Sequence, residues 1–110
     1  MSYKIRELSD YLLPENPFSD KVNAIVHDEY QRAEQAPNDD IKREIDDGLY
    51  LAVKKRMKRR QYESDTQTYI IGLLRDLEDA ENEFGQIAFE SETTRSTFRN
   101  LRTGLLSLLN

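Results

Sequence analysis

The chain has no cysteine and no tryptophan, and its 110 residues include only one histidine, three prolines and four glycines. Without cysteine there is no disulfide, no thiolate metal ligand and no cysteine nucleophile. Few glycines and prolines mean few turns, which favours long elements. The histidine, His27, follows Val26 in "IVHDEY". A lone histidine in such a setting is typical of a packing residue, and no nucleophilic triad can be assembled around it.

Long hydrophobic runs are also lacking. The longest uncharged apolar stretch, "YIIGLL", is far shorter than the roughly 20 residues of a membrane span. The first eighteen residues lack the apolar run of a signal peptide. The two glycine-rich phosphate-binding motifs, G-x-x-x-x-G-K-[ST] and G-x-G-x-x-G, are both absent. The E-x-x-H motif of helical di-iron sites is absent as well. We therefore expect a cytoplasmic protein with no membrane contact, no cofactor, no bound metal and no catalytic residue.

Apolar residues make up 37% of the chain and charged residues 34%, so the core of a single domain spanning 1–110 would be thin. Apolar residues recur at helical spacing, and no run alternates as a strand would. We predict an all-α fold of four to five helices, either a small bundle or an elongated hairpin. The expected helices begin near residue 5, at Ser19 or Asp20, after Asn38, near Ile70 and near Thr93.

The connection between residues 39 and 84 has two interpretations. Ser64 and Gln67 match a capping box, which would start a new helix at Ser64 and make a hairpin. The apolar stripes of the two halves are nevertheless in phase, as one long central helix would require. Both alternatives stay open on the sequence alone.

The strongest local feature is a basic run in a chain whose net charge is −5. On a helical wheel its cations point in all directions, which is unlike a helix that reads DNA with one face. Three interpretations follow: a solvated helix end, an ion-paired surface, or a phosphate-binding surface for nucleic acid. The run consists of Lys54, Lys55, Arg56, Lys58, Arg59 and Arg60.

The matching acid is expected in "RDLEDAENEF", which contains Asp76, Glu78, Asp79, Glu81 and Glu83. A hairpin turning at 63–64 would place the arginines of the run opposite residues 67–71, away from this acid. One long helix paired antiparallel with a second copy would instead oppose Lys55 to Glu81, Lys58 to Glu78, and Arg60 to Asp76. This pairing predicts a homodimer whose register is set by charge.

The C-terminal "LRTGLLSLLN" holds more leucine than one buried face needs. We expect Leu105, Leu106 and Leu109 to contribute to a docking face for a partner or a second copy.

Taken with the charge pattern, this predicts a non-catalytic adaptor or regulatory protein that acts through protein–protein contacts as a homodimer. The alternative is a nucleic-acid-associated factor that binds phosphates through residues 54–60. A third interpretation is a magnesium-dependent enzyme like the all-α nucleotide pyrophosphatases, with carboxylates one turn apart on two helices. Those carboxylates are Glu44, Asp47, Glu78 and Glu81.

Overall fold

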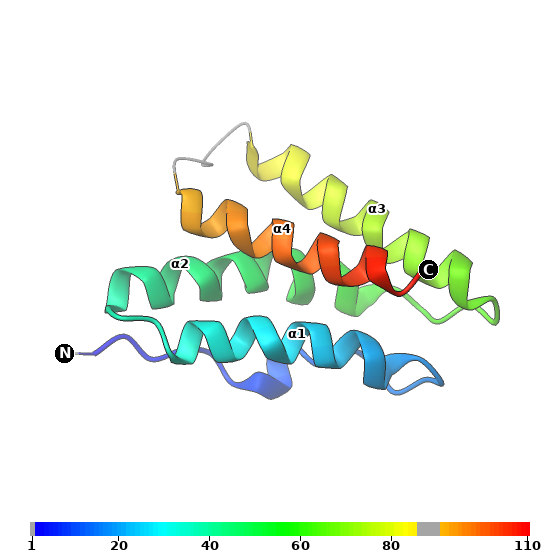
Figure 1. Ribbon diagram of the computed structural model, residues 1–110, viewed down its shortest axis with the longest axis horizontal. Helices are drawn as coiled ribbons and strands as arrows, with labels where there is room; N and C mark the ends of the chain where they lie inside the picture. Colours follow the sequence, from blue (N-terminus) through cyan, green and yellow to red (C-terminus); the bar gives the residue numbers. More distant parts are fainter. Residues whose placement is uncertain (1, 86–90) are drawn as a thin grey trace.

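The computed structural model describes residues 2–85 and 91–110, and all regular structure in these residues is helical. Figure 1 shows four α-helices that run alternately in opposite directions along the long axis, with α4 between α2 and α3. The all-α prediction is confirmed. The elements are η1 (Leu8–Asp10), α1 (Ser19–Glu34), α2 (Asp39–Leu49), η2 (Tyr50–Lys54), η3 (Met57–Arg59), α3 (Thr66–Gly85) and α4 (Glu92–Ser107).

Side-chain caps define the starts of α2, α3 and α4. The amide of Ile41 donates to the Asn38 side chain over 3.0 Å, so Asn38 caps α2 as predicted. At α4 the Thr94 amide donates to the Ser91 hydroxyl over 3.1 Å. Helix α1 ends at Glu34, ahead of the proline at position 37 that prevents the helix from continuing.

The single long central helix is not confirmed, because the chain turns back between η3 and α3. Helix α2 widens into the π-helical turn η2, closed by the Lys55 amide donating to the Tyr50 carbonyl. Arg56 then leaves helical geometry, with φ −124° and ψ −67°. The next helix is capped by Asp65, one residue after the predicted Ser64, and the Asp65 carboxylate accepts from the Gln67 amide and the Thr68 hydroxyl. These bonds lower the pKa of Asp65.

The predicted first helix near residues 5–12 is wrong. Residues 2–13, the N-terminal strap, contain only the short 3₁₀ turn η1. Figure 1 shows them behind α1, and their hydrogen bonds reach α2. The reason is a buried carboxylate: Asp46, fully buried in α2, accepts from the Tyr3 hydroxyl (2.6 Å), the Tyr11 hydroxyl and the Arg6 amide (3.1 Å). An amide that donates to Asp46 is not available for a helical bond, so the strap stays extended.

No helix in residues 2–85 and 91–110 has the length and apolar character to cross a membrane. The core lies between the strap and the inner faces of the four helices. Every element contributes to it except the turn η1. Its largest fully buried side chains include Tyr11, Ile45, Leu49, Met57, Tyr69, Ile70, Leu73, Leu77, Phe98, Leu101 and Leu105.

Replacing the buried carboxylate tests its role. We expect Asp46→Asn to lower the free energy of unfolding by about 3 kcal/mol, because the amide NH₂ would replace an oxygen that accepts hydrogen bonds and would leave buried donors of the strap without an acceptor. The neighbouring Asp47→Asn is the matched control, since Asp47 also contacts Arg6 (3.3 Å) but is half exposed. Urea unfolding followed by circular dichroism measures both. Equal effects of the two substitutions would show that Asp46 does not hold the strap.

We expect the two tyrosines of the strap to make the free energy of unfolding fall at high pH. Burial, then the hydrogen bond to Asp46, raises the pKa of Tyr3 to about 12, and the same causes raise that of Tyr11. A pKa raised in the folded state stabilises the fold below the unfolded value of about 10, and this contribution is lost as pH rises through about 12. Unfolding free energies measured between pH 9 and 12 should fall less steeply in Tyr3→Phe. A slope unchanged by that substitution would contradict this origin.

Candidate functional site

Three cations of the basic run form ion pairs with carboxylates of the same chain. Lys54 Nζ lies 3.3 Å from Asp10 in the strap, and Arg56 pairs with Glu83. The third, Arg60, pairs with Asp76 on α3. The run therefore connects three segments: the strap, the turns η2 and η3 that follow α2, and the returning helix α3. The expected acid faces this base, but within one molecule.

The pair between Arg60 and Asp76 has the most specific geometry. Arg60 donates through Nε to Asp76 Oδ2 over 2.7 Å and through Nη2 to Oδ1 over 2.9 Å, the two-pronged arrangement that a guanidinium and a carboxylate favour. The bonds to Asp76 raise the pKa of Arg60. The guanidinium reaches Asp76 across Gly72, where a Cβ would lie 2.5 Å from Arg60 Nη1. A side chain at position 72 would make the guanidinium move, so the glycine permits this close approach.

The register of this pair follows from the shape of the linker. Residues 60–65 have no helical structure, and Arg60 itself is extended. An extended residue advances the chain by about 3.3 Å and a helical one by about 1.5 Å. Helix α3 therefore needs about two residues to retrace each residue of linker, which brings Asp76 rather than Gln67 level with Arg60. The hairpin register expected from a tight turn at 63–64 is wrong for this reason.

Of the other three cations, two make different contacts and one makes none among the described residues. Lys58 Nζ donates to the carbonyl oxygens of Ser9 (3.1 Å) and Asp10 (3.2 Å), where it closes the turn η1. Lys55 Nζ lies 5.2 Å from the centroid of the Phe84 ring. Arg59 is exposed and makes no side-chain hydrogen bond or ion pair among the described residues.

Two adjoining hollows open over this part of the surface, and we call them together the basic hollow. The first, about 450 Å³, lies between η3, the start of the linker and Asp76; the second, about 320 Å³, reaches Lys55 and Glu83. Arg56 and Arg59 line both. Tyr62 forms one wall of the larger hollow and packs edge-on against Tyr69, with ring centroids 5.1 Å apart.

The remaining predicted carboxylates do not meet the run. Glu81 pairs instead with Arg102 of α4. Glu78 and Asp79 are exposed on α3 and form no ion pair within residues 2–85 and 91–110. The pairings of Lys55 with Glu81 and of Lys58 with Glu78 are thus absent within the chain.

The carboxylates considered for magnesium are not brought together. Glu44, Asp47, Glu78 and Glu81 all lie in described parts of the chain, yet no group of three or more potential ligands forms there. Two of the four are engaged by arginines: Asp47 by Arg6 and Glu81 by Arg102.

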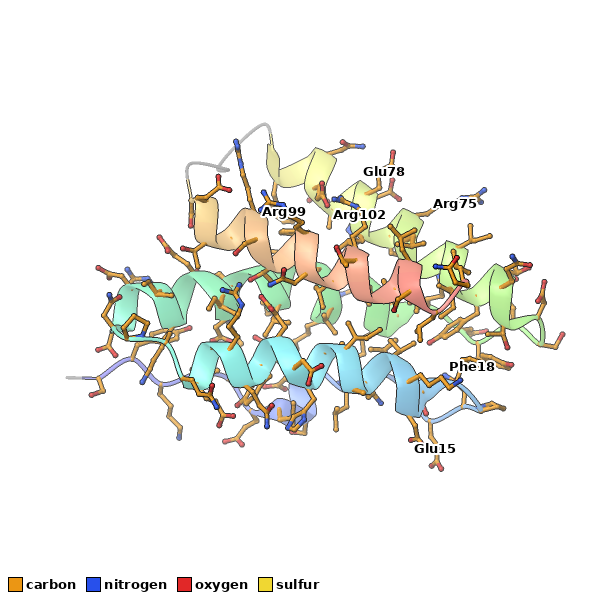
Figure 2. All side chains as sticks on the ribbon, viewed as in Figure 1. Glu15, Phe18, Arg75, Glu78, Arg99 and Arg102 are labelled. Carbon is orange, nitrogen blue, oxygen red and sulfur yellow. The ribbon has the colours of Figure 1, made fainter. Side chains whose placement is uncertain are left out.

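The C-terminal leucines separate into two roles. Leu105 is fully buried, so the expectation that it belongs to a docking face is wrong; the inner side of α4 needs it for the core. Leu106 is 47% exposed, and Leu109 is half-buried. Figure 2 shows Arg99, Arg102, Arg75 and Glu78 on the side of the molecule where α3 and α4 lie next to each other.

Sequence reasoning missed several residues that complete the site. Glu83 was grouped with the acidic block but was not assigned to Arg56, and Asp10 lies 44 positions before its partner Lys54. Gly72 carries no recognisable signal. The sequence does offer one sign, the capping motif at 64–67, because a helix start there sends α3 back past the run.

The comparisons with known proteins add no assignment: a scan of protein-family models, a search of curated proteins and a search of solved structures each found no match.

The crossing of Arg60 over Gly72 gives a quantitative prediction. Gly→Ala inside a helix normally stabilises by about 1 kcal/mol. In Gly72→Ala we expect no net gain, because the methyl group displaces the Arg60 guanidinium from Asp76. In an Arg60→Ala background the same substitution should recover the full gain. Thermal and urea unfolding of the four variants measures this, and a gain of about 1 kcal/mol in the parent protein would count against the crossing.

Proposed function

We propose that the protein is a non-catalytic adaptor or regulator that acts through protein–protein contacts, and that it pairs with a second copy through the α3–α4 face. The proposal rests on four apolar side chains of α3 and the C-terminal end of the chain that are exposed or half-buried, which we call the seam patch. Its members are Ile71 (38% exposed), Leu106 (47% exposed) and the half-buried Leu74 and Leu109. Exposed apolar side chains that gather in one place are typical of interaction surfaces.

The ion pair between Glu81 and Arg102 supports this grouping. It aligns the antiparallel helices so that each step forward on α4 is a step backward on α3. Leu106, four residues after Arg102, is then level with residue 77, and Leu109 is level with Leu74. The four apolar side chains thus belong to one end of the seam, next to the C-terminus.

Charge complementarity favours a second copy as the occupant. Arg75 and Glu78 are exposed, opposite in charge and one turn apart, and neither forms an ion pair among the described residues. A two-fold axis that crosses both helices at this level sets α3 antiparallel to its copy. Each Arg75 then faces the Glu78 of the other molecule, and the two Leu106 side chains meet near the axis. Leu106 and this charge pair replace the basic run as our reason for a dimer.

A nucleic-acid-associated factor is the second candidate, and Arg59 favours it because this guanidinium has no partner in the described residues. Phosphates would have to compete with Asp10, Glu83 and Asp76 for half of the run, and the net charge of −5 opposes a polyanion. We therefore rank it below the protein-binding function.

The lack of cysteine supports our proposal of a cytoplasmic location.

Self-association is testable by sedimentation equilibrium up to high micromolar concentration. We expect a mass of twice 12.9 kDa. Leu106→Glu should weaken the dimer more than about tenfold, since two like charges would meet near the axis. Leu12→Glu is the matched control, because Leu12 is 37% exposed but lies in the strap.

Charge reversal tests the symmetry of the dimer. Arg75→Glu and Glu78→Arg should each weaken pairing, and the double reversal should restore it, because every facing pair is then opposite in charge again. A parent protein that stays monomeric would overturn the proposal. A dimer indifferent to Leu106 would assign the interface to another face.

A further inference from the structure

The basic hollow is a second candidate binding surface, and it shares no residue with the seam patch. Its larger part, about 450 Å³, lies within the range of about 300–1,000 Å³ that small-molecule sites occupy. It is formed by chain segments that meet only because the linker 60–65 turns α3 back along the run.

Two of its guanidinium groups are held in place before any ligand arrives. Arg60 uses Nε and Nη2 on Asp76, and Arg56 is fixed by Glu83. A guanidinium has five N–H donors, so each of these side chains keeps donors that its carboxylate does not use. Preorganised donors reduce the loss of conformational entropy on binding. Arg59, which lines both parts of the hollow, supplies a guanidinium with no partner in the described residues.

The charge of the hollow limits the size of its ligand. Lys55, Arg56, Arg59 and Arg60 bring four cations, while three carboxylates lie among them. The surplus is one positive charge, on a protein whose total is negative. A compact anion matches this surplus, whereas a long polyanion would extend beyond the hollow into repulsive surface. The three carboxylates are Glu63, Asp76 and Glu83.

The wall beside Arg59 is aromatic. Tyr62 is half-buried, and its position is set by the edge-on contact with Tyr69 and by its hydroxyl donating to the Ser64 carbonyl over 3.4 Å. A tyrosine face next to guanidinium groups is a combination that binds a ring and a phosphate together. The exposed Gln61 adds an amide at the rim.

We propose that the basic hollow binds a phosphate monoester carried on an aromatic ring system, the class to which mononucleotides belong. The phosphate is received by Arg59 with the spare donors of Arg56 and Arg60, and the ring packs against Tyr62. This inference does not depend on the proposed dimer.

Titration calorimetry of the full chain tests the site with adenosine monophosphate, inorganic phosphate and a short single-stranded oligonucleotide as probes. We expect the mononucleotide to bind about tenfold more tightly than inorganic phosphate, because stacking adds to the phosphate contacts. Arg59→Gln should weaken both about tenfold. The matched control is Arg43→Gln, an exposed arginine of α2, which should change neither.

A second pair of variants separates the ring contact from folding. Tyr62→Leu should remove the advantage of the mononucleotide over phosphate, and Tyr62→Phe should keep it. Equal affinities for mononucleotide and phosphate, or equal losses in Arg59→Gln and Arg43→Gln, would overturn the proposal. Tighter, steeply salt-dependent binding of the oligonucleotide would also overturn it, in favour of a strand-binding surface.

Discussion

The ion pair of Arg60 with Asp76 determines how the two halves of the molecule meet. It joins the end of the basic run to the second half of α3 through two hydrogen bonds of 2.7 and 2.9 Å, at a glycine that lets the guanidinium lie against the helix. The partly buried setting makes such a bidentate pair more effective than an exposed one. With α3 held in this register, Tyr69, Ile70, Leu73 and Leu77 enter the core.

Such ion pairs also explain why an acidic protein has six lysines and arginines within seven residues. The run lies where the chain changes direction, so its cations can reach segments on both sides: the strap through Asp10, and α3 through Asp76 and Glu83. Apolar packing alone is non-directional and would tolerate a slip of α3 along its neighbours. Paired charges at both ends of the contact make such a slip unfavourable, because each cation would lose its carboxylate.

The helices were predictable from local signals, and their arrangement was not. Asn38 and Ser91 cap helices through bonds that span three residues, and a sequence displays such bonds directly. The strap was missed because its conformation depends on Asp46, 40 positions beyond the Arg6 amide that it accepts from. Ile5, Leu8 and Leu12 have helical spacing, but a buried carboxylate needs donors, and the extended strap supplies them. The local preference of these residues for a helix was thus overridden by the need of the buried Asp46 for hydrogen-bond donors far away in the sequence.

The candidate site shows the same contrast: its residues could be predicted from the sequence, and their arrangement could not. The sequence identified the basic run and its acidic complement, including the pair of Arg60 with Asp76. It assigned that pair to two molecules because a rigid helix and a tight turn were the only connections considered. An irregular linker, in which each residue advances the chain about twice as far as a helical residue, makes the pairing possible inside one.

That difference changes what the surface can offer to a partner. Cations that already hold carboxylates are fixed in position and nearly neutral as a group, so they suit recognition of a small anion more than attraction of a large one. Arg59 is the exception, and it lines both parts of the hollow together with Arg56. The exposed apolar side chains Ile71 and Leu106 lie instead on α3 and α4. The fold thus separates a polar, preorganised hollow from an apolar face, and the two can act without competing for the same residues.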